Sequence, residues 1–338
     1  MKVKLYFGAP DKISHSGIGR AFVHQKRALD LAGVDYITHE DQDMDYDILH
    51  INTVLPDSFP EIIHAKMNGK KVIYHAHSTE EDFRNSFLFS NALSGIFKRW
   101  LVFLYSKADY ILTPTPYSKS LLTSYQLEKP IKAISNGIDL EEYTPTKIQI
   151  EQFNQKYQIN QDDIVIISVG WLFERKGFDT FIEVAKLLPN YKFFWFGDVE
   201  KSRPTFKIQM LINHLPPNVI LPGYVDGNII KGAYGRSNIF FFPSREETEG
   251  IVVLEALASK CDVLLRDIPV FDPWLENGRD CYKASDEQGF VEMIQKMIHE
   301  EVPSLIENGY QVAKERQLDI IGQELLDVYT EVLEMETE

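Results

Sequence analysis

The sequence predicts an α/β protein built from two doubly wound, Rossmann-like parallel sheets that face each other across a cleft. The chain has 338 residues, which is more than a single domain usually holds. Short runs that are apolar nearly throughout alternate with helical stretches, as expected for parallel strands covered by helices on both faces. The two halves also open with the same order of strand, glycine loop and helix. These observations together favour two α/β domains with ligands at the carboxyl ends of the strands.

Four β-rich runs mark the strands expected in the first half. They lie at residues 2–8, 46–52, 70–77 and 108–114. The segment "SGIGRAFVHQKRALDLAG" (16–33) follows the first of them and reads as a glycine loop with a helix behind it.

The second half repeats this plan, with strands expected at 163–171, 191–197, 218–224 and 238–244. A turn-rich segment followed by polar residues, 135–155, is expected to be the linker between the halves.

The end of the chain has the pattern of an amphipathic helix. Its apolar residues recur at helical spacing, at positions 318, 321, 325, 329 and 332. We therefore expect a first domain over 1–145, a second over 146–318 and a terminal helix over 319–338.

Composition argues against several classes of protein. The net charge of −15 argues against broad binding of nucleic acid, which needs a basic face. The two cysteines, Cys261 and Cys281, suggest neither a disulfide framework nor a zinc site. No run approaches the length of a spanning helix, and the start of the chain does not resemble a signal peptide. A cytoplasmic protein, free or attached to a membrane surface, is expected.

Glycines and aspartates near the amino terminus give two weaker signals. Gly17 and Gly19 precede a helix and could let backbone amides approach a phosphate, but Phe22 breaks the dinucleotide-binding pattern. The aspartate run of 41–47 could hold a metal ion, yet it precedes a strand, on the side away from the expected ligands. A solvated acidic loop is the preferred interpretation, with no metal site.

Two further motifs lie where strands end. His75 and His77 share one face of a strand, and His77 is expected to contact a substrate in the cleft; zinc would need a third ligand that the sequence does not offer. Arg175 and Lys176 precede a helix, where adjacent cations and helix-end amides can grip a diphosphate.

The stretch "REETEGIVVLEALASK" (245–260) places carboxylates on either side of a glycine. Glu247 should lie in a loop at the mouth of the cleft, and Glu255 about two turns into the following helix. Gly250 frees the backbone, so that the first amides of the helix can face a phosphate, while a glutamate suits the hydroxyls of a sugar or ribose.

The motifs in company resemble the retaining glycosyltransferases of family 4 (GT4), which have the GT-B fold. "PSREETEGIVVLEALASK" resembles the family's pair of glutamates separated by seven residues. "SNGIDLEEYTP" resembles its N-G-V-D-x-x-x-F-x-P motif, and "RKGFDTFIEV" its K-G-x-x-x-L-I-x-A motif. The matches recur in order from residue 16 to residue 262. The resemblance implies two facing Rossmann-like domains and a final helix that crosses back to the first domain.

The resemblance also implies a UDP-sugar donor, either UDP-glucose or UDP-galactose, with no metal or other cofactor. Glu255 would bind the ribose hydroxyls, and Glu247 would contact the donor sugar. Arg175 and Lys176 would neutralise the diphosphate, and His77 would lie near the donor sugar. The family retains the anomeric configuration, and we assign no enzymic nucleophile.

Further donor contacts are implied at the helix ends and in one loop. Gly17 would approach the diphosphate from the first domain. Tyr224 and Val225 lie where the family's base-contacting loop runs. Backbone contacts to phosphate or sugar are implied at three successive residues, Gly250, Ile251 and Val252.

The sequence departs from the family pattern in three places. Trp171 stands where the family often has arginine, and Arg175 is the candidate substitute. Glu249 replaces the aromatic residue of the family's G-F-G and is expected to add a charge near the donor. Lys260 stands where the family has a small residue.

The segment 83–108 suggests the acceptor. It contains four basic residues, no acidic ones and many apolar or aromatic ones, which suits an anionic membrane surface. The chain resembles bacterial enzymes that add a hexose to diacylglycerol or glucosyl-diacylglycerol, at the inner face of the cell membrane. Of these reactions, transfer of the second sugar, to glucosyl-diacylglycerol, is expected. Three alternatives remain open: a soluble or capsule-building hexosyltransferase, a sugar-nucleotide epimerase of similar architecture, and a binding module without turnover.

Overall fold

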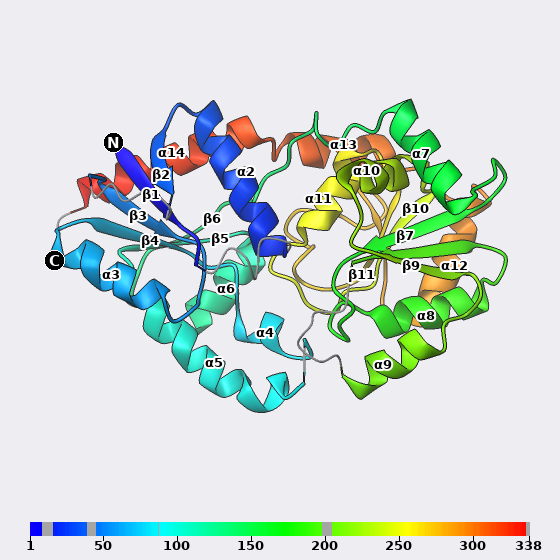
Figure 1. Ribbon diagram of the computed structural model, residues 1–338, viewed down its shortest axis with the longest axis horizontal. Coiled ribbons are helices and arrows are strands. Elements are labelled where there is room, and N and C mark those ends of the chain that lie inside the picture. The colour runs from blue at the N-terminus through cyan, green and yellow to red at the C-terminus, as the bar shows by residue number, and fades with distance from the viewer. Residues whose placement is uncertain (9–15, 39–44, 87, 198–204, 336–338) are drawn as a thin grey trace.

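Two α/β lobes lie side by side in the computed structural model, which describes residues 1–8, 16–38, 45–86, 88–197 and 205–335 (Figure 1). Within these residues each lobe has one six-stranded sheet, and all pairings between neighbouring strands are parallel. The predicted fold class is confirmed. The domain boundaries at 145 and 318 stay a prediction.

The sheet of the first lobe has the strand order β2-β1-β3-β4-β5-β6. Its strands are β1 (Lys2–Tyr6), β2 (Asp35–Thr38), β3 (Ile48–Ile51), β4 (Lys71–His75), β5 (Tyr110–Thr113) and β6 (Ile131–Ala133). Its helices are α2 (Gly17–Leu31), α3 (Ser58–Met67), α4 (Glu80–Phe83), α5 (Ser90–Tyr105) and α6 (Pro116–Ser124). One core packs α2 on one face of the sheet, and a second core packs α3, α5 and α6 on the other.

The sheet of the second lobe has the order β12-β11-β10-β7-β8-β9. Its strands are β7 (Val165–Val169), β8 (Lys192–Phe196), β9 (Val219–Gly223), β10 (Ile239–Phe242), β11 (Val263–Arg266) and β12 (Tyr282–Ala284). Its helices are α7 (Lys147–Tyr157), α8 (Phe178–Leu187), α9 (Phe206–Asn213), α10 (Gly227–Arg236), α11 (Ile251–Ala258), α12 (Glu287–Ile298) and α13 (Ile306–Lys314). Two cores, one on each face of the sheet, give the doubly wound arrangement.

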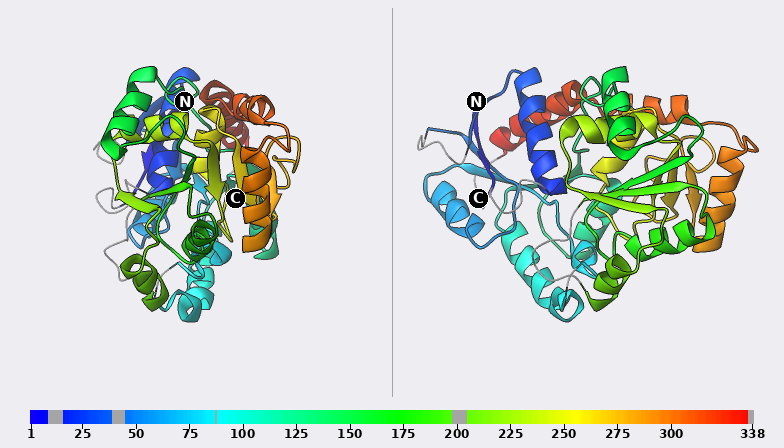
Figure 2. Two further views of the ribbon diagram at one scale, coloured as in Figure 1. Left: turned by 90° about the vertical axis from the view of Figure 1, so that its right-hand side faces the viewer. Right: turned by 45° about the vertical axis from the view of Figure 1, so that its right-hand side comes forward.

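The last helix, α14 (Leu318–Glu334), crosses back and packs against α2 of the first lobe, as predicted (Figure 2). Gly322 makes the close approach possible, because a Cβ there would strike the backbone of Ala28. The five predicted apolar positions are all buried, and Val328 joins them in the core of the first lobe.

One sequence expectation was wrong in part. The second half of the predicted linker, 135–155, forms α7, whose start is a capping box: the Thr146 hydroxyl accepts from Gln149 N, and the Gln149 side chain accepts from Thr146 N. Phe153 of this helix is fully buried in the second lobe. The chain between β6 and α7 is therefore the shorter connection between the lobes.

Helices of the described residues are not long and apolar enough to cross a membrane. The strand predicted at 163–171 is the buried strand β7, which ends at Val169.

Candidate active site

Two loops of the second lobe meet where their strands end. The loop over 170–177 follows β7, the loop over 243–250 follows β10, and β7 and β10 are neighbours in the sheet. Gly177 closes the first loop with φ +76°, and a side chain there would strike the Pro243 carbonyl. This glycine lets the two loops touch.

The contact between these loops centres on Glu247, whose side chain is buried. Its Oε1 lies 2.5 Å from Lys176 Nζ and accepts a 2.7 Å hydrogen bond from the Ser244 hydroxyl. Burial opposes ionisation of Glu247, but the charges of Lys176 and Arg175 outweigh it and lower the pKa of the carboxyl. The arrangement places an ionised carboxylate beside a cation, at the end of the sheet where donors are expected.

Arg175 is the second cation of the predicted pair, and it reaches into the first lobe. Its guanidinium lies 2.8 Å from a carboxylate oxygen of Asp82 and donates to the Ser86 hydroxyl at 3.0 Å. Its distance to Glu247 is longer, 3.9 Å. Lys176 is therefore the cation paired directly with Glu247, while Arg175 joins the two lobes. Their roles toward a diphosphate stay predictions.

Glu255 lies on α11 and is buried, 4% exposed. It is the fifth residue of the helix, so the expected depth of two turns was wrong and one turn is correct. The hydroxyls of Tyr143 and Tyr234 donate to its two oxygens at 2.7 and 2.9 Å. Arg20 of α2 approaches from the other lobe, with Nε 3.5 Å away. The carboxylate is thus oriented on both oxygens and faced by a cation.

The predicted helix-end contacts lie at the amino-terminal ends of α2 and α11. Gly17 is the first residue of α2 and is exposed, and Figure 1 shows this end of α2 next to α11. Gly250 is the N-cap of α11 with φ +85°. It has no side chain, so no side-chain oxygen accepts from the first amides of the helix. The amides of the first turn, from Ile251 and Val252, have no intrahelical partner, which makes this end suited to an anion.

His77 follows β4 and is almost completely buried. Its ring stacks on His75 with centroids 4.1 Å apart, and its Nε2 lies 3.2 Å from the Asn52 side-chain oxygen. Burial lowers the pKa of His77 to about 3, so the ring is neutral near pH 7. A contact with the donor sugar stays a prediction, and it would involve a neutral imidazole.

Tyr224 and Val225 follow β9 at the edge of the sheet. The side chain of Tyr224 is 64% exposed, whereas Val225 packs on the core of the second lobe. Their contact with the base of the UDP-sugar stays a prediction.

The acidic run lies only partly within the described residues. Asp41 and Asp43 fall outside them, and Asp47 accepts a 2.8 Å hydrogen bond from the backbone of Lys2. The described parts of the chain contain no group of three histidines, cysteines or carboxylates that could hold a metal ion.

The hydrogen bonds of Glu249 join the loop of Glu247 to the connection between the lobes. Its carboxylate is buried and is bound by Ser135 and Asn136 of the connection between the lobes. Trp171, the other departure near the site, is half-buried and stacks on Phe173 at 6.2 Å. The predicted charge of Glu249 beside the donor stays a prediction, and burial raises the pKa of this carboxyl.

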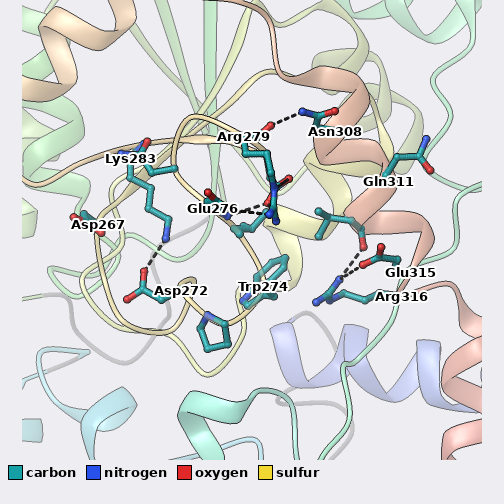
Figure 3. Close-up of a pocket in the computed structure, with 15 residues that line it drawn as sticks. Asp267, Asp272, Trp274, Glu276, Arg279, Lys283, Asn308, Gln311, Glu315 and Arg316 are labelled. Atoms are coloured by element: carbon teal, nitrogen blue, oxygen red, sulfur yellow. Dashed lines mark hydrogen bonds and ion pairs between the residues drawn. The ribbon is translucent and has the colours of Figure 1, made fainter.

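A cavity of about 890 Å³ opens beside α13 (Figure 3). None of the predicted site residues lines it. Its charged side chains are paired with one another: Lys283 with Asp272 and Arg279 with Asp280, both at 2.8 Å. We do not assign the donor to this cavity, because the paired charges leave little for a diphosphate to bind.

Comparison with known proteins agrees with this geometry. Residues 8–142 match the family model described as Glycosyltransferase Family 4, and residues 149–315 match the model described as Glycosyl transferases group 1. The chain is 44% identical to the processive diacylglycerol alpha-glucosyltransferase of Acholeplasma laidlawii over 99% of both chains. It belongs to glycosyltransferase family 4. The predicted enzyme class is confirmed, and the epimerase and binding-module alternatives are set aside.

One further relative of this glycosyltransferase and two solved structures have lower sequence identity. The alpha-galactosylglucosyldiacylglycerol synthase of Streptococcus pneumoniae is 22% identical over 96% of this chain and 87% of its own. Among solved structures, Anabaena HepE in complex with UDP and glucose superposes with a TM-score of 0.76 at 17% identity, over 98% of this chain and all of the other. Sucrose-phosphate synthase from Thermosynechococcus elongatus superposes with a TM-score of 0.82 at 16% identity, over 98% of this chain and 99% of the other. These structures support the GT-B fold.

Sequence reasoning missed several residues that shape the site of this glycosyltransferase. Tyr143 and Tyr234 hold Glu255, and Tyr143 lies inside the motif "SNGIDLEEYTP". Tyr143 occupies the position where the family motif has phenylalanine, and that substitution was the available signal. Asp82 and Arg20 carried no motif of their own, because they reach the site from the first lobe only in the folded chain.

Proposed function

We propose that this glycosyltransferase moves a glucosyl group from UDP-glucose to a membrane glycolipid, diacylglycerol or glucosyl-diacylglycerol, with retention of the anomeric configuration. The observation that carries the proposal is the full-length relative from A. laidlawii, a processive diacylglycerol alpha-glucosyltransferase. UDP-galactose is the second candidate donor, and the S. pneumoniae relative that is named for a galactosyl product supports keeping it.

The chemistry follows from charge. Breaking the bond between sugar and phosphate leaves a diphosphate anion and a sugar with oxocarbenium character. Lys176 and the free amides at the start of α11 would stabilise the departing diphosphate. Glu255 would hold the ribose, since its oxygens are fixed by two tyrosine hydroxyls and can still accept from sugar hydroxyls.

Glu247 would contact the donor sugar rather than attack it. Its Oε1 already accepts from Lys176 and Ser244, which leaves its charge compensated and its position fixed. A carboxylate in this state is a weak nucleophile and a good hydrogen-bond acceptor. Attack by the acceptor on the face that the diphosphate leaves would retain the configuration, with the leaving phosphate taking the acceptor proton.

A lipid acceptor is supported by the outer face of α5. Phe89 at its start is 70% exposed and Ile96 is 66% exposed, and three more apolar side chains are exposed on this segment. These three are Leu88, Leu93 and Phe103. The spacing 89, 93, 96 and 103 places them on one stripe of the helix, while Leu101 and Leu104 face the core. We call the five exposed residues the α5 stripe: Leu88, Phe89, Leu93, Ile96 and Phe103.

The charges near the α5 stripe support an anionic surface as its partner. Arg99 is exposed, and Lys107 lies over the Phe103 ring at 5.2 Å. Lys98 is engaged inside the lobe instead, 3.3 Å from Glu80 and over the ring of Tyr125. An exposed apolar stripe with cations beside it suits the headgroup region of an anionic bilayer. Peripheral attachment to the inner face of the cell membrane is therefore part of the proposal.

The test is transfer from labelled UDP-sugars to lipids in vesicles. The purified protein is incubated separately with UDP-glucose and UDP-galactose, with diacylglycerol or glucosyl-diacylglycerol in anionic vesicles, and the labelled lipid is identified. Labelled glycolipid formed from UDP-glucose supports the proposal. Transfer only to a water-soluble saccharide would support the soluble or capsule-building alternative instead.

A further inference from the structure

Glu249 makes an unusual set of contacts for a residue next to the donor loop. Its side chain is 2% exposed. Its Oε1 accepts from the Ser135 hydroxyl at 2.5 Å, and its Oε2 accepts from the Asn136 side-chain amide at 2.6 Å and the Asn136 backbone amide at 3.1 Å. Three donors therefore converge on one buried carboxylate, and both residues that supply them lie on the connection between the lobes.

The same short segment is where the chain crosses twice between the lobes. The Ser135 hydroxyl also accepts from Gly137 N at 3.1 Å, which closes the turn. Ile138 N donates to the Arg316 carbonyl at 2.9 Å, so the outward crossing is bonded to the returning one. Glu249 is thus held at the two crossings between the lobes, which we call the hinge, beside a cavity of about 240 Å³ that it lines with Ser135 and Arg316.

The position of Glu249 in the chain links this hinge to the predicted donor contacts. It lies two residues after Glu247 and directly before Gly250, the N-cap of α11. The rest of the loop touches the first lobe as well: Thr115 donates to the Thr248 carbonyl at 2.7 Å, and the Tyr117 hydroxyl donates to Glu246 at 3.0 Å. Among these contacts between the loop and the first lobe or the hinge, those of Glu249 are the most buried, and three donors hold its carboxylate.

We propose that Glu249 is a positioning residue, which ties the loop of Glu247 and the start of α11 to the hinge and so makes their placement depend on how the two lobes close. Glu249 acts through this loop and does not touch the donor. Loss of its carboxylate would leave the partly buried donors of Asn136 unpaired and free the loop to move relative to the first lobe. The reaction in this proposal is the one given under the proposed function. The choice of Glu249 depends only on the contacts described above.

A positioning residue and a residue that binds the donor directly affect the kinetics differently. A residue that sets the geometry of the reacting groups lowers kcat, because small misplacements slow the chemistry steeply. A residue that holds the donor in both ground and transition states raises KM and weakens UDP binding in the same proportion. The two roles therefore give different patterns in the same variant.

The experiment compares Glu249→Ala, Glu249→Gln and Ser135→Ala with the wild-type protein. We expect Glu249→Ala to lower kcat about 10- to 100-fold, with the Kd for UDP changed less than about threefold. Glu249→Gln, which keeps an oxygen acceptor, should recover most of kcat. Ser135→Ala combined with Glu249→Ala should be no slower than Glu249→Ala alone, because both remove the same contact.

Glu315→Ala is the matched control, since it removes an exposed carboxylate near the same crossing and should leave kcat unchanged. Circular dichroism confirms folding, and if Glu249→Ala does not fold, Glu249→Gln and Ser135→Ala carry the test. Wild-type kcat in folded Glu249→Ala, or in Ser135→Ala where Glu249→Ala does not fold, would overturn the proposal. A loss of UDP affinity equal to the loss of kcat would also overturn it.

A second readout separates this proposal from the proposed acceptor. Slow hydrolysis of UDP-glucose by water, measured without lipid, needs the same donor loop. If the wild-type protein transfers to no lipid, the proposed acceptor is wrong, and the hydrolysis rates of the variants still decide the role of Glu249.

Discussion

Lys176 Nζ and Glu247 Oε1 lie 2.5 Å apart, and this buried ion pair joins the loops that follow β7 and β10. The two residues are 71 positions apart in the chain. Each compensates the charge of the other in a largely buried site, so a change of one residue alone leaves the charge of its partner without compensation.

Glu247→Gln should lower transfer at least about 100-fold, because a neutral amide cannot hold Lys176 or the sugar as the carboxylate does. Glu247→Ala should abolish transfer. Both should still bind UDP, since Glu255 and the start of α11 remain. The rate of glycolipid formation and the UDP affinity are measured on protein whose circular dichroism matches the wild type. Undiminished turnover would refute the role of Glu247.

Lys176→Met should also lower kcat, by about 100- to 1,000-fold, because the leaving diphosphate loses its nearest cation. Methionine keeps the length of the side chain and its packing. Lys186→Met on α8 is the control, since its partner Glu183 is exposed and its loss removes only a surface pair. A Lys176→Met enzyme that keeps its kcat would show that the diphosphate is stabilised elsewhere.

Tyr234→Phe removes a hydrogen bond to Glu255 while keeping the buried ring. We expect UDP to bind about 5- to 30-fold more weakly, since a hydrogen bond to a charged group contributes roughly 1–2 kcal/mol. Isothermal titration with UDP measures the change. Tyr282→Phe, which removes a hydroxyl bonded to the Pro303 carbonyl elsewhere in the lobe, is the control and should bind UDP as the wild type does.

Changing Ile96 to Ser and Arg99 to Glu should weaken binding to anionic vesicles, because both side chains lie exposed at the α5 stripe. Flotation with vesicles of anionic phospholipid measures the bound fraction. Lys98→Glu is a poor test, because Lys98 is paired with Glu80 and its reversal would disturb the lobe itself. Lys147→Glu on α7 makes the same charge change at an exposed site and should leave flotation unchanged. Equal flotation of all these proteins would reject the stripe.

Stability should fall as the pH is lowered below about 6.5, because of the buried histidines of the first lobe. Burial lowers the pKa of His50 to about 3, that of His77 to about 3 and that of His75 well below its usual value. The unfolded chain takes up protons between pH 6.5 and 3 that the folded chain does not, so each histidine costs up to about 1.4 kcal/mol of stability per pH unit in that window.

His75→Phe should reduce this acid sensitivity. Both ring nitrogens of His75 lack a hydrogen-bond partner among the described residues, so an apolar ring in the same stack should cost little at pH 7. Urea unfolding at pH 7.0 and 5.5 measures the difference. His214→Gln, at an exposed position, is the control and should leave the pH dependence unchanged. A His75→Phe protein with the acid sensitivity of the wild type would contradict the prediction.

The apolar runs of the sequence located the strands at the centre of both sheets, because a parallel strand buried on two faces needs an apolar side chain at nearly every position. The strands that were missed are short. β2, β6 and β12 lie at sheet edges, and β12 contains three residues. Edge strands are covered on fewer sides, so their sequences carry less of the apolar signal. β11 was missed although it is buried next to β10.

The sequence predicted which loops and helices carry the site residues, but it did not predict the contacts that these residues make. Spacing alone placed Glu247 before a helix and Glu255 within it. It could not show that the Tyr143 hydroxyl holds Glu255 from 112 residues away, or that Arg175 pairs with Asp82 of the other lobe. Such partners depend on how the lobes meet. Glu249 is the clearest case, since its sequence position suggested the donor and its contacts lie at the hinge.

Helix α14 has a consequence for the order in which the protein matures. The core around β1 is completed by side chains from the far end of the chain, including Leu325, Tyr329 and Val332. These residues are synthesised after the second lobe, whereas domains otherwise tend to fold as soon as they emerge. The core of the amino-terminal lobe is therefore completed only after the second lobe has been synthesised, and until then its face for α14 stays open.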